Sequence, residues 1–144
     1  MRTVSRHSGI EVLGPDECRA LLAQDDIGRV AVVIGATPMI FPVNYALDGD
    51  AIILRTMPGS RLDVGQGLAA FEVDGFDRTG RSGWSVLVTG HLEEVPWYQT
   101  EDVERLQAWP VVSWPLGERN MWLRLRPSST TGRVVPGDQP GSTP

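Results

Sequence analysis

Short apolar runs joined by tight turns are the feature that most limits how this chain can fold. Residues 28–34 and 38–47 are rich in β-branched and aromatic side chains, and the Gly-containing segment 35–37 separates them. The sequence Asp-Gly-Asp at 48–50, a favoured hairpin turn, leads to a third run at 51–55. Parallel strands would need much longer connections between them. The sequence therefore predicts an antiparallel meander.

The second half of the chain continues the β pattern. Further strands are expected at 69–74, 83–95 and 121–126, the second with Gly90 as a bend or bulge. Short helices are expected from Gly14 to near Asp25, at 60–68 and at 96–108. About six strands with tight turns and two or three short helices predict a mainly β protein, an antiparallel barrel with short helices.

Length and composition indicate one globular domain. The chain has 144 residues, of which 41% are hydrophobic and 22% charged. We expect a flexible N-terminus at 1–9, a folded domain at 10–133 and a disordered tail at 134–144, which is rich in Gly and Pro. A net charge of -5 argues against a nucleic-acid partner. The single Cys18, together with the lack of a signal peptide or a long apolar span, predicts a cytoplasmic protein without a membrane partner.

Familiar catalytic motifs are missing from the sequence. There is no G-x-G-x-x-G, no P-loop and no spacing of histidines and cysteines typical of a metal site. His7 lies in the expected flexible end, and His91 falls inside a strand, so a hydrolase triad has little support. We therefore expect no metal, and the catalytic residues remain unknown.

A polar turn directly after the third strand is the best local candidate for a ligand site. Arg55, Thr56, Ser60 and Arg61 combine positive charge with hydroxyl donors just before an expected helix. Such groups suit a phosphate, because arginines neutralise it while hydroxyls and a helix start donate hydrogen bonds. The alternative is an ordinary turn that carries surface arginines.

Two further segments carry groups that suit a flat ring. Pro42 interrupts the second strand, and Val43, Asn44 and Tyr45 follow it; the alternative is an edge strand with a polar rim. The pair Trp84 and Ser85 opens the longest strand, where the tryptophan can flank a ring or belong to the core. The late tryptophans are most simply explained by packing or by a subunit interface. They are Trp109, Trp114 and Trp122.

The order of these motifs resembles the pyridoxamine 5'-phosphate oxidase-related family of flavin-binding split barrels, and in particular its small actinobacterial flavin-nucleotide-binding members. The resemblance extends over residues 10–133. Its motifs are Gly28-Arg29-Val30-Ala31, Phe41-Pro42-Val43-Asn44-Tyr45, Asp48-Gly49-Asp50, Arg55-Thr56-x-x-Gly59-Ser60-Arg61-Leu62, Phe71-Glu72-Val73-Asp74, Gly83-Trp84-Ser85-Val86-x-Val88-x-Gly90 and Trp122-x-Arg124-x-Arg126-Pro127.

The resemblance implies a six-stranded antiparallel split barrel that forms a homodimer, with flavin mononucleotide (FMN) in a groove between the subunits. It places the cofactor phosphate on Arg55, Thr56, Ser60 and Arg61, and the ring beside 42–45. It also implies ring contacts from Trp84 and Ser85. From the other subunit, it makes Trp114 and Arg119 candidates.

Two departures from the family pattern narrow the expected function. Leu62 stands where the true vitamin B6 oxidases have a second basic residue, and no histidine follows Arg119 in the manner of their Arg-x-His signature. We therefore expect an FMN-binding oxidoreductase for another small organic substrate. The alternatives are a module that binds or stores flavin, deazaflavin or haem without turnover, and an interaction domain without a ligand.

Overall fold

The computed structural model describes residues 3–4, 9–56, 67–95 and 121–137, which form one helix and eight strands. The elements in chain order are β1 (Thr3–Val4), β2 (Glu11–Leu13), α1 (Pro15–Gln24), β3 (Ile27–Ile34), β4 (Thr37–Asp48), β5 (Ala51–Thr56), β6 (Gly67–Asp77), β7 (Ser82–Glu94) and β8 (Met121–Val135).

Six of these strands close into a ring. Their order is β8-β5-β4-β3-β6-β7, and a further pairing of β7 with β8 completes the circle. Every pairing is antiparallel. Closure satisfies the backbone groups that an open sheet would leave exposed at its edges. The structure thus confirms the expected antiparallel barrel, with β1 and β2 as additions that the sequence did not predict.

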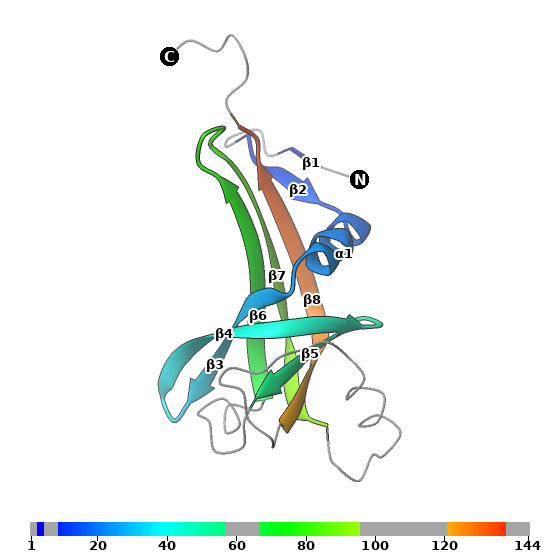
Figure 1. The fold of residues 1–144 in the computed structure, drawn as a ribbon, viewed down its shortest axis with the longest axis vertical. Coiled ribbons are helices and arrows are strands. Elements are labelled where there is room, and N and C mark those ends of the chain that lie inside the picture. Colours follow the sequence, from blue (N-terminus) through cyan, green and yellow to red (C-terminus); the bar gives the residue numbers. More distant parts are fainter. Residues whose placement is uncertain (1–2, 5–8, 57–66, 96–120, 138–144) are drawn as a thin grey trace.

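Strands β6, β7 and β8 are long and extend beyond the ring, as Figure 1 shows. The early part of β8, residues Met121–Leu125, pairs with β5, whereas Gly132–Val134 pairs with β2. β7 pairs with β8 along most of its length. Helix α1 lies against β8 between these two regions (Figure 1). The molecule therefore has two ends that are far apart, one near Met121 and one near Val135.

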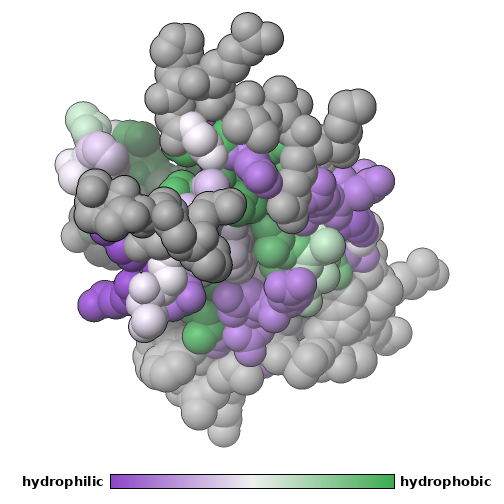
Figure 2. Space-filling view, turned by 90° about the horizontal axis from the view of Figure 1, so that it is seen from above, coloured by the Kyte–Doolittle hydropathy of each residue, from purple (hydrophilic) through white to green (hydrophobic). Residues whose placement is uncertain are grey.

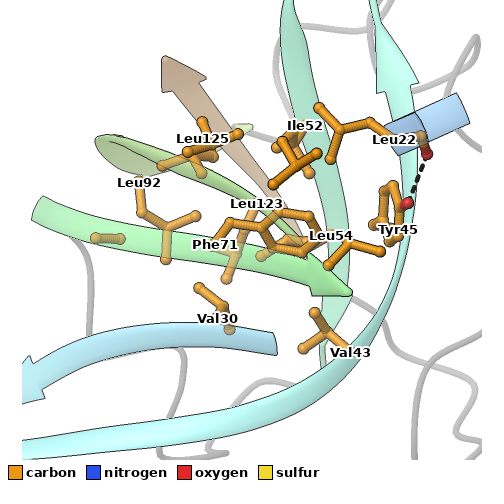
Figure 3. Packing of buried hydrophobic residues seen from close by; sticks show 14 of the residues in the cluster. Leu22, Val30, Val43, Tyr45, Ile52, Leu54, Phe71, Leu92, Leu123 and Leu125 are labelled. Atoms are coloured by element: carbon orange, nitrogen blue, oxygen red, sulfur yellow. Dashed lines mark hydrogen bonds between the residues drawn. The ribbon is translucent and has the colours of Figure 1, made fainter. Parts of the chain in front are cut away.

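The core fills the ring with side chains from alternate strand positions. Phe71 of β6, Ile52 and Leu54 of β5, and Leu123 and Leu125 of β8 are all fully buried, and Figure 3 shows them converging. This alternation is the period of two that a strand imposes on its side chains. Burial of these apolar groups supplies the main stabilising free energy of the barrel.

Proline 42 sits inside β4 without ending the strand. It pairs with Arg29 of β3, and β5 reaches only as far as Tyr45 on the other side. Among the described strands, β4 thus has a single neighbour at Pro42, which is where a residue lacking an N–H is tolerated. The expected interruption is therefore an edge position.

Two boundaries differ from the sequence prediction. β8 continues to Val135, so the expected tail at 134–144 begins within a strand, and only 138–144 lies outside the described residues. β6 begins at Gly67, so the end of the expected helix 60–68 is strand. The helix expected at 96–108 lies outside the described residues. In the part of the chain that is described, no helix has the length and apolar character needed to span a membrane.

Candidate functional site

The outer surface of the barrel near the start of β8 carries the first of the predicted phosphate ligands. Arg55 pairs with Trp122 across β5 and β8, and its guanidinium carbon lies 5.1 Å from the centre of the tryptophan ring. Ile52 and Leu54 point into the core, so Arg55 and its neighbour Ile53 face outward. A cation over an aromatic face is held in place by electrostatic attraction to the ring.

Two more arginines share this face. Trp122, Arg124 and Arg126 alternate with the buried Leu123 and Leu125 along β8. Arg124 pairs with Ile53 and is therefore a diagonal neighbour of Arg55 across the two strands. The Cα atoms of such neighbours lie about 7–8 Å apart. The start of β8 therefore presents a row of positive charge outside the barrel.

Glu93 of β7 partly neutralises the positive charge at the Arg126 end of this row. Its Oε1 accepts a hydrogen bond from Nε of Arg126 at 2.5 Å, and it lies opposite Arg124 in the strand register. Arg126 is thus paired with a carboxylate. Arg55 and Arg124 are half-buried, and the Nε atoms of both are buried.

A small apolar cluster forms the floor of this surface, which we call the arginine face (Arg55, Trp122 and Arg124). The cluster consists of Ile53, Val95 and Trp122, with Ala46 packed against it. It lies outside the main core, and the backbone N–H of Val95 donates to the carbonyl of Trp122 at 2.8 Å. Two arginines anchored on a rigid apolar floor are well suited to hold an anion, because their forked donors match phosphate geometry.

The structure divides the predicted segment 42–45 between two sides of β4. Val43 and Tyr45 are buried in the core, whereas Pro42 and Asn44 face outward. Asn44 comes directly before Tyr45, which pairs with Leu54, and so it lies on the same side as Arg55 at the edge of the arginine face.

The hydroxyl of Tyr45 has a structural role within the chain. It donates to the carbonyl of Leu22 at 2.5 Å, the dashed bond in Figure 3, and its ring packs edge-on against Phe71 with centroids 4.9 Å apart. Burial raises the pKa of this phenol, and the nearby carboxylates of Asp25 and Asp26 raise it further. The Tyr45 side chain therefore belongs to the core, and the predicted contact of the 42–45 segment with a ring stays a prediction.

The predicted pair Trp84 and Ser85 lies at the other end of the molecule. Trp84 pairs with Val134, whereas Arg55 pairs with Trp122. The twelve residue-to-residue steps from 122 to 134 span about 40 Å of strand at about 3.3 Å each. As consecutive strand residues, Trp84 and Ser85 also point to opposite faces. Within one chain, neither residue joins the arginine face.

Several predicted residues cannot be placed. Ser60, Arg61, Trp114 and Arg119 lie outside the described residues, and of Thr56 only the backbone is described, paired with Met121. In the described part of the chain no group of three or more histidine, cysteine or acidic side chains gathers as a metal site would require.

Arg124 is a candidate site residue that was not singled out from the sequence, although its motif was recognised. The signal was present in the alternation Trp122-x-Arg124-x-Arg126, because a period of two places all three on one side of a strand. Its partner in space, Arg55, is remote in sequence, and only the pairing of β5 with β8 brings them together.

Comparison with known sequences identifies the family of this fold. Residues 14–134 match the pyridoxamine 5'-phosphate oxidase family. The chain belongs to the pyridoxamine 5'-phosphate oxidase-like family. It is also 37% identical over 115 residues to an uncharacterized protein from Mycobacterium tuberculosis, covering 74% of each chain.

Solved structures of related proteins share the architecture. An FAD-binding protein from Mycobacterium smegmatis is 28% identical, with a TM-score of 0.74 over 86% of this chain and 98% of that one. A protein from Corynebacterium glutamicum, provisionally named a pyridoxamine 5'-phosphate oxidase, is 25% identical, with a TM-score of 0.78 over 90% of this chain and 96% of that one. The split barrel expected from the family resemblance is therefore confirmed.

Proposed function

We propose that this protein binds a flavin nucleotide, whose phosphate is held by Arg55 and Arg124. The observation that carries this proposal is the arginine face, where two half-buried arginines share one side of a rigid strand pair beside Trp122. The fold supports it, because a related protein of similar structure is an FAD-binding protein. A bound flavin would supply hydride or electron transfer, which the side chains themselves cannot perform.

Each residue of the face has a distinct part in this proposal. Arg55 and Arg124 donate charge-assisted hydrogen bonds to the phosphate, while Trp122 fixes the position of Arg55. Asn44 and the outward backbone of β4 border the face, and we assign them the contacts to the ring. Ser60 and Arg61 belong to the segment that leaves β5 one residue after Arg55, and we retain them as proposed phosphate ligands.

The proposed cofactor is FMN, because two local arginines suit a single phosphate group. The alternatives are FAD, which the M. smegmatis protein binds, and the deazaflavin cofactor. Both have longer anionic tails than FMN. Mass spectrometry of the ligand released from the purified protein distinguishes the three. A nicotinamide nucleotide is then added, and reduction of the bound flavin is monitored by its absorbance. Turnover separates an oxidoreductase from a protein that only stores flavin.

The proposed assembly is a homodimer. Ser85 and Arg55 lie about 36 Å apart along β8, which is longer than a flavin mononucleotide can bridge. If Ser85 contacts a flavin held at Arg55, it must come from a second copy of the chain. Light scattering tests this directly: we expect twice the mass of the chain at micromolar concentration, and a monomer would contradict the proposal.

Charge-removing variants test the phosphate assignment. Arg55→Gln and Arg124→Gln should each weaken FMN binding at least tenfold, since one charge-assisted hydrogen bond contributes about 1.5–3 kcal/mol. Riboflavin has no phosphate, and its affinity should not change. Arg126→Gln is the matched control, because Arg126 lies on the same strand outside the proposed phosphate pair, and its side chain is exposed and bonded to Glu93. Equal FMN affinity in all three variants would refute the assignment.

A further inference from the structure

A cleft at the opposite end of the molecule lies between α1 and the β6–β7 hairpin. Its volume is about 610 Å³, within the range of about 300–1,000 Å³ that is usual for small-molecule sites. Ala20 and Leu21 of α1 form one side, and Trp84 and Val134 form the other. Figure 2, which views the molecule from this end, shows hydrophobic side chains exposed between hydrophilic ones.

The indole of Trp84 packs against a glycine on the neighbouring strand. Gly75 pairs with Trp84, and a Cβ at Gly75 would lie only 2.5 Å from the indole Nε1 and 2.8 Å from Cε2. The ring therefore rests directly on the β6 backbone. Trp84 packs against the core and also lines the cleft, and it is only half-buried. This arrangement leaves part of a rigid aromatic surface for a ligand.

The charge of the cleft differs from that of the arginine face. Glu17 and Asp77 contribute carboxylates to its walls, and none of the described lining residues is an arginine or a lysine. A phosphate would meet repulsion here. A cation would be favoured twice, by the carboxylates and by the electron-rich face of Trp84.

We propose that this cleft is a second binding site, which takes a planar cationic heteroaromatic molecule stacked on Trp84. Flat aromatic groups stack on tryptophan with defined geometry, and positive charge adds a cation–π contribution. The site is about 40 Å along β8 from Arg55 and shares no residue with the arginine face. It does not depend on the binding of a flavin.

Two quinoline probes of opposite charge test the site. Binding of 1-methylquinolinium, a cation, and of quinaldate, an anion, can be followed by ¹⁵N–¹H spectra of the tryptophan indoles in the full-length protein. Trp84→Phe identifies the Trp84 signal. We expect 1-methylquinolinium to shift that signal and to bind at least tenfold more tightly than quinaldate. No shift, shifts only at other tryptophans, or tighter binding of quinaldate would overturn the proposal.

Variants on the exposed surface of α1 keep the test independent of folding. Ala20→Lys places a positive charge on the cleft wall and should weaken 1-methylquinolinium binding at least fivefold. Ala23→Lys adds the same charge to an exposed position of the same helix outside the cleft, and its affinity should match the wild type. Equal affinities of the two variants would place the probe elsewhere.

A final control separates this site from the proposed flavin site. The double variant Arg55→Gln with Arg124→Gln should bind 1-methylquinolinium as the wild type does, even though FMN binding is lost. If the double variant lost the probe as well, the two sites would be one, and the second site would be refuted. Failure of FMN binding in the wild type would leave the probe result unaffected.

Discussion

Replacing Tyr45 by Phe tests whether this residue belongs to the core or to a ligand site. The change removes one hydroxyl and keeps the ring that packs against Phe71. The lost hydrogen bond to the carbonyl of Leu22 contributes about 0.5–1.5 kcal/mol net, and a buried carbonyl left without its donor adds to the cost. We therefore expect a loss of about 1–2 kcal/mol in the free energy of unfolding.

Urea denaturation followed by fluorescence measures this loss, and FMN titration of the same variant supplies the second readout. The affinity for FMN should stay within twofold of the wild type, because the hydroxyl of Tyr45 points into the fold. An unchanged free energy of unfolding combined with a tenfold loss of FMN affinity would refute the reasoning, since it would mean that the hydroxyl serves a ligand.

The pH dependence of stability gives the same variant a third readout. Burial raises the pKa of the Tyr45 phenol above its unfolded value of about 10. Below pH 10 both states keep the proton. Above pH 10 the unfolded state releases it first, so the free energy of unfolding should fall by up to about 1.4 kcal/mol per pH unit. Tyr45→Phe should lack this component of the alkaline loss, and equal slopes in both proteins would contradict it.

Three further predictions concern the scaffold. Gly90→Ala should lower the free energy of unfolding by about 2 kcal/mol or more, because the added Cβ would lie 2.0 Å from the backbone oxygen of Arg126. The Tm should fall by several degrees, and a wild-type Tm would contradict this. Arg29→Leu should lower the free energy of unfolding by about 1 kcal/mol or less at low salt, since the ion pairs of Arg29 with Glu72 (2.6 Å) and Asp74 (2.8 Å) are partly exposed. The difference from the wild type should shrink in 1 M NaCl. The Cys18 thiol is buried, and burial raises its pKa, so it should react with a disulfide reagent only in urea; rapid labelling of the native protein would show otherwise.

The barrel could be predicted from sequence because its signals are local. Tight turns and β-branched runs fix neighbouring strands, and the Asp48-Gly49-Asp50 turn does join β4 to β5. The length of β8 was missed because Pro127, Ser128 and Ser129 resemble a turn. In the structure Ser128 is the extra residue at a bulge, since Gly90 pairs with Pro127 and Thr89 with Ser129. The strand passes through this irregularity and continues.

The candidate site was only partly predictable because it depends on which face each residue occupies. Arg55 was identified from its position in a polar turn directly after a strand, and the structure places it on an outward face beside Trp122. Residues 42–45 were assigned to a ring as one segment, although strand alternation predicts that Val43 and Tyr45 share the inner side of β4. The partnership of Arg55 with Arg124 depends on the pairing of β5 with β8, which no local pattern encodes.

The affinity of the wild-type protein for FMN relative to riboflavin tests the central proposal most directly. The two ligands share the same ring and differ only in the phosphate. If Arg55 and Arg124 hold that phosphate, FMN should bind at least tenfold more tightly than riboflavin, and the ratio should fall as salt is added. Equal affinities at low salt, or no binding of either ligand, would contradict the assignment of the arginine face as a flavin phosphate site.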